Sequence, residues 1–222
     1  GIGVVRISGE QVQTILRAIF SSAPKKLVPR YVMFGEIKDP VLGSSIDEAC
    51  VIYFKGPQSY TGEDVVEIQL HSSVFVLKKV VQIILGLGAR LAGKGEFTQR
   101  AFVNGKMDLS KAESVIDLIH SQSDTAHRVA LHHVQGKLFE WVSSYRLQLM
   151  QFLEELEGSI DFPEEVPIVD RTVLLDCVQN IQSQVTRCLD LKDFGHLVHS
   201  GVKCVIVGCP NVGKSSLFNV LS

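Results

Sequence analysis

Hydrophobic and polar residues alternate in short runs through the first hundred residues of the chain. Runs rich in β-branched residues end at turn signals, which predicts strands at Val4–Ile7, Ala49–Phe54 and Val65–Leu70. Apolar residues spaced three and four positions apart predict helices over Gln11–Phe20 and Val74–Leu85. Strands with interspersed helices indicate an α+β or α/β unit.

The pattern becomes helical after Gly105. Ser110 and Glu113 stand at capping-box spacing, which predicts the start of a helix at Ser110. Apolar residues then recur at helical intervals for several turns. Residues 110–157 are therefore predicted to form either one very long helix or two helices joined near Gly136.

Three further features follow this helical run. Pro163 and Pro167 end it, because proline cannot continue a helix. The amphipathic stretch Val173–Leu189 predicts another helix that packs on the first, which makes the middle of the chain a helical bundle. Lys203–Val207 is a compact β-branched run that predicts a strand, and a new helix opens at Lys214.

Composition places the chain among ordinary soluble globular proteins. Hydrophobic residues make up 45% of it, charged residues 21%, and the formal net charge is −2, which excludes a disordered chain, a collagen-like repeat and a polybasic nucleic-acid arm. Without a secretory leader or an apolar run of membrane-spanning length, the chain is expected to be soluble and intracellular. The five cysteines form no C-x-x-C pair, so reduced and mostly buried thiols are expected at Cys50, Cys177, Cys188, Cys204 and Cys209.

Gly208–Ser215 matches the pattern G-x-x-x-x-G-K-[ST] directly after the predicted strand and before the predicted helix. Glycines allow backbone N–H groups to curl around phosphate oxygens, and the helix N-terminus adds partial positive charge. Lys214 is suited to neutralise the β- and γ-phosphates, and Ser215 offers a hydroxyl to Mg²⁺. This loop predicts nucleotide binding.

The motifs that select guanine or activate hydrolysis do not follow the loop. Neither a D-x-x-G nor an N-K-x-D sequence lies after it, and Asn104–Asp108 has the wrong spacing for a guanine-reading role. About 21 residues from Val202 are too few for a nucleotide-binding domain, since domains have roughly 50–200 residues. We therefore expect the chain to be a fragment at its C-terminus and, lacking an initiator Met, at its N-terminus.

Polar residues in the first 110 positions suggest a site for an anionic ligand. Strand alternation places Arg6 on the face opposite Val5 and Ile7, and Glu67 interrupts an apolar run. A third cluster around two glycines contains Glu96, Arg100, Asn104, Lys106 and Asp108. The alternative interpretation is surface salt bridges and, for Glu63 and Asp64, a solvated turn.

Other conspicuous side chains are interpreted as structural. The helical segment contains four histidines without carboxylates at metal-ligand spacing: His120, His127, His132 and His133. The acidic run Asp161–Glu165 is expected to be a solvated turn, and Trp141 is expected in the core rather than as a base-stacking platform.

The order of motifs resembles a known family. The sequences are GIGVVRISG, GPQSYTGEDVVEIQLH, GEFTQRAFVNGKMDLSKAESVIDLI, IDFPEE and GCPNVGKSSLFNVL. They resemble, from the first residue to the last, the bacterial and organellar tRNA-modification GTPases called MnmE or TrmE, whose mitochondrial counterpart is the GTP-binding protein 3 family. The chain departs from the family at His71-Ser72-Ser73, where the family has H-G-G, and serine would be strained at a backbone position that needs a positive φ.

The resemblance implies a fold of three parts. Residues 1–105 would form an α+β domain that resembles folate-binding aminomethyltransferases and mediates dimerisation. Residues 106–201 would form the first part of an α-helical domain. Residues 202–222 would be the first strand and P-loop of an inserted Ras-like α/β GTPase domain.

The resemblance also implies site residues and cofactors. A tetrahydrofolate derivative, formyl or methylene, would contact Arg6, Glu67 and Lys106. GTP would contact Asn211, Val212, Gly213, Lys214, Ser215 and Ser216, with Ser215 as a Mg²⁺ ligand and Asn211 as a K⁺ ligand.

The activity implied by the resemblance is GTP hydrolysis coupled to tRNA modification. Family members form homodimers and work with the FAD-dependent partner MnmG to install an aminomethyl-type group at carbon five of the wobble uridine, in the cytoplasm or the mitochondrial matrix. Two alternatives remain open: a folate-binding and dimerisation module with an inert P-loop, and another P-loop ATPase or kinase. No membrane partner is expected.

Overall fold

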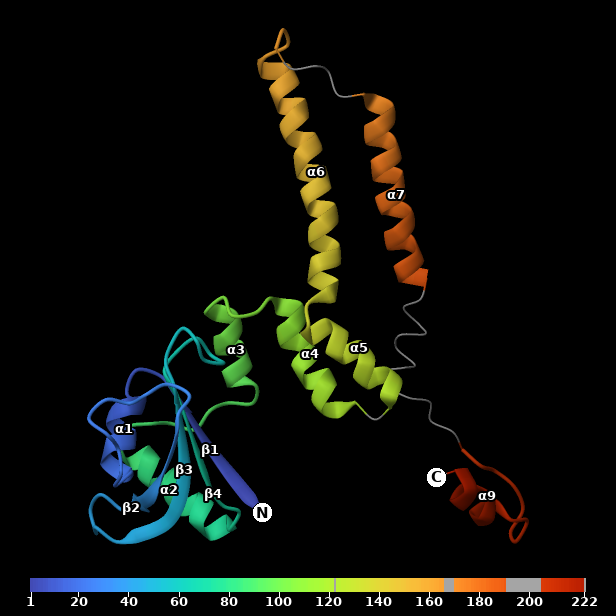
Figure 1. Ribbon diagram of the computed structural model, residues 1–222. Coiled ribbons are helices and arrows are strands. Elements are labelled where there is room, and N and C mark those ends of the chain that lie inside the picture. The colour runs from blue at the N-terminus through green and yellow to red at the C-terminus, as the bar shows by residue number, and fades with distance from the viewer. Residues whose placement is uncertain (122, 166–169, 191–204, 222) are drawn as a thin grey trace. The chain divides into compact units, whose positions relative to one another are not determined.

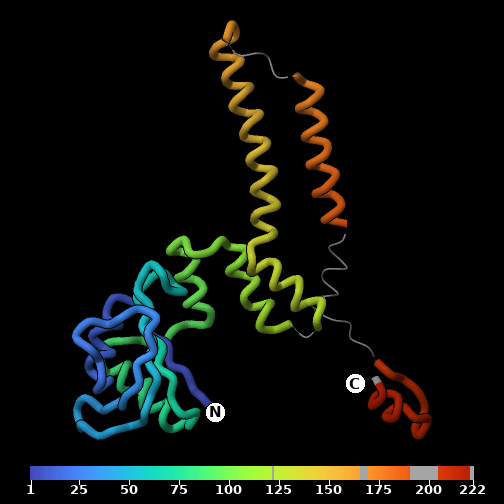
Figure 2. The backbone as a smooth tube through the Cα atoms, in the orientation of Figure 1, coloured from blue at the N-terminus to red at the C-terminus, as the bar shows by residue number. Residues whose placement is uncertain are grey.

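The computed structural model describes residues 1–121, 123–165, 170–190 and 205–221, and it divides into two compact units, Gly1–Val115 and Ile116–Ser222 (Figure 1). The division falls inside α4 (Leu109–His120). Domain limits at residues 105 and 201 stay predictions. Figure 2 shows the backbone as a tube, coloured by residue number from the N-terminus to the C-terminus.

The first unit is built on a four-stranded antiparallel sheet. Its spatial order is β1 (Ile2–Ser8), β4 (Val65–His71), β3 (Ser45–Phe54) and β2 (Val32–Lys38). Three of these strands were predicted, whereas β2 was missed. Gly35 and Glu36 interrupt the apolar pattern of β2, and pairing with β3 provides the backbone hydrogen bonds that hold it in the sheet.

Two helices cover one face of this sheet. They are α1 (Val12–Ile19) and α2 (Val74–Gly86), both close to the predicted bounds. Alternate strand residues such as Ile7, Val51 and Ile68 form one buried cluster with Leu16 of α1 and Val80 of α2. Burial of this single apolar face drives the folding of the unit.

The opposite face of the sheet is not covered by these helices. Val4, Val32 and Phe34 on this face are 53%, 54% and 64% exposed, although they are apolar. Arg6 and Glu67 lie on the same face, because residues of one face alternate along each strand. We refer to it below as the open face.

A short helix, α3 (Glu96–Val103), follows α2 and was not predicted. It begins after Gly95, whose φ of +74° favours glycine, and it buries only Ala101. Its polar sequence gave little helical periodicity. The next helix, α4, begins at Leu109 rather than at Ser110, because the Asp108 carboxylate accepts a hydrogen bond from the Lys111 N–H (3.0 Å) and caps the helix.

The helical segment after residue 109 is confirmed, but it is broken twice. α5 (Asp124–Val134) and α6 (Lys137–Asp161) are separated at Gly136, with φ +86°, which is the second of the two predicted alternatives. The further break between α4 and α5 was missed. There the Ser123 hydroxyl accepts from Ala126 N (3.2 Å) and caps α5.

Two long helices, α6 and α7 (Arg171–Asp190), bury no residue. The Tyr145 hydroxyl of α6 donates to Gln184 Oε1 of α7 (2.5 Å). Trp141 is half-buried and packs edge-to-face on Tyr145 with ring centroids 5.0 Å apart, so the expectation of a core position was wrong. A core for a complete helical bundle is not formed by the described residues.

The last described segment contains the glycine loop and α9 (Lys214–Leu221). The helix after the loop was predicted. The predicted strand is not present at Val205–Val207, and Lys203 and Cys204 lie outside the described residues. A strand requires a neighbour for its backbone hydrogen bonds, and Val205 and Val207 are 82% and 86% exposed.

The cysteine prediction was half right. The four described cysteines are free thiols, but Cys188 and Cys209 are exposed and Cys50 and Cys177 are only partly buried. Burial of most thiols was therefore a wrong expectation for the described positions, whereas Cys204 lies outside them.

Candidate functional site

Arg6 and Glu67 form an ion pair on the open face of the sheet. They are cross-strand partners in β1 and β4, which brings together side chains 61 positions apart. Arg6 Nη2 and Nε lie 2.6 and 2.8 Å from the same oxygen, Glu67 Oε1. Glu67 Oε2 takes no part in this pair, so the carboxylate can accept from a further donor.

Two aromatic rings lie close to the Arg6 guanidinium. Its Cζ is 5.9 Å from the ring centroid of Tyr60 and 5.6 Å from that of Phe97. Such cation–π contacts stabilise the guanidinium at this position. The Tyr60 and Thr98 hydroxyls are 2.9 Å apart, which joins the loop to α3. Sequence reasoning missed both rings, because nothing in their spacing indicates that they meet Arg6.

The loop Gly56–Glu63 that carries Tyr60 is anchored by the carboxylate of Asp64. Its Oδ2 accepts from the Tyr53 hydroxyl (2.7 Å) and Gln13 Nε2 (2.9 Å), and its Oδ1 accepts from Gly56 N (2.9 Å). Burial raises the pKa of Asp64, but these hydrogen bonds outweigh burial and hold the pKa below its usual value. The alternative interpretation of a solvated turn is therefore wrong for Asp64.

Lys106 packs against the same loop. Its backbone N–H donates to Ala101 O (2.8 Å) at the end of α3. Its Cγ lies 3.2 Å from the position that a Cβ on Gly62 would occupy, so the lysine stem packs on that glycine. Asn104 Nδ2 donates to Thr61 O (2.7 Å) beside it. Among the described residues no ion pair joins Lys106 to Glu67.

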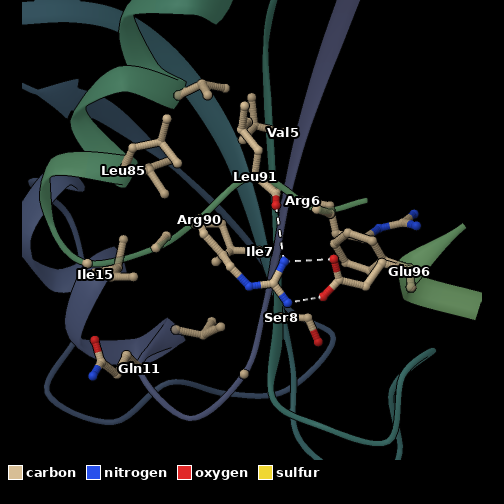
Figure 3. A pocket seen from close by; sticks show the side chains of 18 of the residues that line it. Val5, Arg6, Ile7, Ser8, Gln11, Ile15, Leu85, Arg90, Leu91 and Glu96 are labelled. Carbon is tan, nitrogen blue, oxygen red and sulfur yellow. Dashed lines mark hydrogen bonds and ion pairs between the residues drawn. The ribbon is translucent and has the colours of Figure 1, made fainter. Parts of the chain in front are cut away.

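Glu96 accepts several hydrogen bonds from the segment between α2 and α3. Its carboxylate accepts from both Nη atoms of Arg90 (2.5 and 2.8 Å), as Figure 3 shows. It also accepts from Gly93 N (2.7 Å) and from Arg100 Nη2 (2.8 Å). The hydrogen bonds from Arg90, followed by those from Gly93 and Arg100, hold the pKa of Glu96 well below its usual range. Glu96 is therefore ionised at neutral pH.

A chain of polar contacts continues from α3 to β1. Arg100 Nη1 also binds Glu63 Oε1 (3.0 Å), and the Ser8 hydroxyl donates to Glu63 Oε2 (2.7 Å). Ser8 Oγ is in turn 2.7 Å from the hydroxyl of Thr61, which is fully buried. The loop, α3 and the end of β1 are thus held together by fully partnered polar groups.

The glycine loop Gly208–Ser215 forms a separate candidate site. Asn211 and Gly213 have φ values of +62° and +90°, and consecutive turns of this kind form concave anion-binding nests. The Lys214 ammonium donates to the carbonyl oxygens of Gly208 (3.1 Å) and Cys209 (2.5 Å), so it lies over the loop. Ser215 follows in the first turn of α9, at the positive end of the helix dipole.

The serine pair of His71-Ser72-Ser73 creates no backbone strain. Ser73 has φ −68° and ψ +122°, and Ser72 is not among the described residues with a positive φ. Ser72 N donates to Gly1 O (3.1 Å), an ordinary extension of the sheet. The expectation of a strained position is therefore wrong for this structure.

The described residues contain no group of three His, Cys, Asp or Glu side chains placed to hold a metal ion. None of their helices combines the length and the apolar character needed to cross a membrane.

Comparison with known proteins matches almost the whole chain. Residues 1–106 match the family model described as the GTP-binding protein TrmE N-terminus, and residues 109–215 match the MnmE helical domain. Curated relatives include the tRNA modification GTPases MnmE of Nostoc sp. (40% identity over 222 residues) and Cytophaga hutchinsonii (43% over 222 residues).

These alignments cover 100% and 99% of this chain but only 48% of each relative. A third relative, MnmE of Aquifex aeolicus, is 41% identical over 221 residues, which are 99% of this chain and 49% of that protein. The chain thus spans about half the length of the curated relatives it matches. The resemblance noted from the motifs is confirmed, and the chain belongs to the MnmE (TrmE) family.

Proposed function

We propose that this chain provides the folate-binding module and the phosphate loop of a GTPase that modifies the wobble uridine of tRNA. The observation that carries the nucleotide part is the Gly208–Ser215 loop, with two residues of positive φ and the Lys214 ammonium directly over it. Backbone N–H groups, a lysine and a helix N-terminus together favour bound triphosphate. Relatives named tRNA modification GTPases support the choice of GTP and of tRNA.

The residues of the loop fit GTP, Mg²⁺ and K⁺. Lys214 would pair with the β- and γ-phosphates, while Val212, Gly213 and Ser216 would supply backbone contacts to phosphate oxygens. The Ser215 hydroxyl would bind Mg²⁺, and the Asn211 amide oxygen would bind K⁺. Both are hard oxygen ligands of the kind that such cations prefer.

The open face fits a reduced folate beside Arg6, Glu67 and Lys106. Because Arg6 occupies only Oε1, Glu67 retains Oε2 for the N–H donors of a pteridine ring. Tyr60 and Phe97 offer aromatic surface beside the same guanidinium. Bound tetrahydrofolate would supply a formyl or methylene one-carbon unit. The protein would hold the folate and orient this unit.

The exposed apolar residues of the open face support a homodimer through the first unit. Val4, Val32 and Phe34 would be withdrawn from water when two copies pair there. We expect Phe34→Glu to shift the protein from dimer to monomer in analytical ultracentrifugation. Val41→Glu, at a residue 88% exposed outside the strands, is the matched control and keeps the dimer. A dimeric Phe34→Glu protein would contradict this interface.

The proposed reaction installs an aminomethyl-type group at carbon five of the wobble uridine, with an FAD-dependent partner, MnmG. Folate supplies the carbon, and GTP hydrolysis drives the conformational cycle of the dimer. The tRNA substrate locates the activity in the cytoplasm, or in the mitochondrial matrix of a eukaryote.

The decisive experiment measures GTP hydrolysis by the full-length protein with K⁺ and with Na⁺. We expect faster hydrolysis in K⁺, and loss of GTP binding in Lys214→Ala. Lys137→Ala removes an exposed lysine that pairs with Glu140 on α6, and it should leave hydrolysis unchanged. Folate binding without K⁺-stimulated hydrolysis would refute the GTPase mechanism.

A second candidate is a folate-binding and dimerisation module with an inert loop. It is favoured by the buried core that Gly1–Val115 possesses by itself, in contrast to the exposed Val205 and Phe218 around the loop. This candidate predicts that calorimetry of the full-length protein detects binding of 5-formyltetrahydrofolate but no binding of GTP. Arg6→Ala and Lys106→Ala should weaken the folate binding. Detection of GTP binding would exclude it.

A further inference from the structure

A cavity of about 360 Å³ lies at the free edge of β1 (Figure 3). Its apolar wall is made by β1, α1 and the end of α2, and includes Val5, Ile7, Ile15, Ile84 and Leu85. The segment Gly88–Ala92 closes another side. All of these residues belong to the first unit.

Charged side chains also line the cavity. The lining residues include three arginines and two glutamates, namely Arg6, Arg90, Arg100, Glu10 and Glu96. In Figure 3 the Arg90 guanidinium faces Glu96, and Ile15 and Leu85 lie on the opposite side of Arg90. The Arg6 side chain extends away from Arg90. An apolar interior with a guanidinium at its entrance suits a ligand that combines an apolar ring with a carboxylate.

Arg90 is placed to exchange partners. Its side chain is 67% exposed, whereas that of Glu96 is only 13% exposed. If Arg90 turned to a ligand, Glu96 would keep its hydrogen bonds from Gly93 and Arg100. The carboxylate would thus not be left buried without a partner, which is the usual cost of breaking such a pair.

The cavity adjoins the Arg6–Glu67 pair. Arg6 and Phe97 both line it, and their 5.6 Å contact marks the border with the open face. The volume of about 360 Å³ lies at the small end of the ~300–1,000 Å³ typical of ligand sites, which suits one part of a folate better than the whole molecule. A pteridine needs in-plane hydrogen bonds, which Glu67 offers, whereas the tail of the same molecule has a benzoyl ring and carboxylates.

We propose that the cavity holds the p-aminobenzoyl-glutamate tail of the folate, and that Arg90 leaves Glu96 to bind a carboxylate of that tail. This inference rests on the proposed folate function. Arg90 is then a binding residue of the site, and the segment Gly88–Ala92 is its wall. The pteridine remains at Arg6 and Glu67.

Calorimetry of the full-length protein tests the inference with two ligands. The probes are 5-formyltetrahydrofolate and 6-methyltetrahydropterin, which lacks the tail. We expect Arg90→Ala to weaken folate binding roughly 10-fold and to leave pterin binding unchanged, because only the folate carries the carboxylate. Arg90→Glu, which repels the carboxylate, should weaken folate binding more than Arg90→Ala, and Arg90→Lys should recover part of the loss.

The matched control is Arg17→Ala. Arg17 is an exposed arginine of α1 that binds Pro24 O and Lys25 O and does not line the cavity, so its loss should leave both affinities unchanged. Unchanged folate affinity in Arg90→Ala, or equal loss for both ligands, overturns the inference. If pterin binding is undetectable, the change in folate affinity caused by Arg90→Ala decides by itself whether the inference stands. No folate binding by the unmodified protein refutes the proposed function instead, whereas sensitivity to Arg6→Ala without sensitivity to Arg90→Ala refutes only the tail site.

Discussion

Replacement of Asp64 by alanine tests how the loop beside Arg6 is held. The Asp64 carboxylate accepts from Tyr53, Gln13 and Gly56 at 2.7–2.9 Å. Alanine would remove all three acceptor contacts at once. The Tyr53 side chain is almost fully buried, so its hydroxyl would have to find water or another acceptor.

The expected loss in the free energy of unfolding follows from the charge and the burial of the Asp64 carboxylate. Hydrogen bonds to an ionised group contribute about 1.5–3 kcal/mol each, and water that enters the site recovers part of that. We therefore expect Asp64→Ala to lower the free energy of unfolding by about 3–5 kcal/mol, a large share of the ~5–15 kcal/mol typical of a domain. Asp64→Asn keeps one oxygen for Gly56 N and should cost about 1–3 kcal/mol.

The Asp64 contribution also depends on pH. The folded pKa is below the ordinary value of 3.8, so the stabilisation is complete above that value and is lost as the pH falls through the lower folded pKa. The difference between the unmodified protein and Asp64→Asn should therefore shrink in acid. The opposite trend, a penalty that grows below pH 3.8, would contradict the assigned hydrogen bonds.

Urea unfolding followed by far-ultraviolet circular dichroism measures these differences. Fluorescence of the single tryptophan, Trp141, reports on the second unit and serves as an internal control. Asp39→Ala is the matched variant, because Asp39 accepts from Val41 N and Leu42 N in an exposed turn, and its loss should lower the free energy of unfolding much less than Asp64→Ala does. A change within ~0.5 kcal/mol for Asp64→Ala would refute the anchoring role.

Three further substitutions have definite expected outcomes. Glu96→Gln should destabilise the protein at pH 7, because it weakens the pair with Arg90. The loss of stability should shrink as the pH falls below the pKa of Glu96 in the unfolded chain, near 4.5. Equal losses at pH 7 and pH 3 would contradict the lowered pKa of Glu96. Gly56→Ala places a Cβ 2.7 Å from Gly62 O, so unfolding experiments should show a loss of about 1–3 kcal/mol, and an unchanged stability would show that the loop relaxes freely. Ser123→Ala removes the cap of α5 and should cost about 1 kcal/mol in unfolding followed by Trp141 fluorescence, where no shift would argue against the cap.

Much of the fold was predictable from local patterns. Three of the four strands, both helices that cover the sheet and the break at Gly136 follow from alternation, helical spacing and a glycine. The elements that were missed carry weak local signals. β2 is interrupted by Gly35 and Glu36, and α3 is short and polar, so both depend on neighbours that local patterns do not reveal.

The glycine loop gives a strong sequence signal, because all of its groups come from consecutive residues. Its bend at Asn211 and the position of Lys214 agree with that local origin. The strand before it was predicted wrongly for Val205–Val207, because strand formation requires a partner and not only β-branched residues.

The sequence by itself determined the face on which Arg6 lies, since strand alternation leaves no other choice. Only the tertiary structure decided that Glu67 is its partner and that the ring of Phe97 lies beside it. It also decided that Arg90 stands at the mouth of a cavity. The physical reason is that periodicity fixes the direction of a side chain along its own element, whereas strand register and helix packing, which join residues far apart in the chain, fix what that side chain meets.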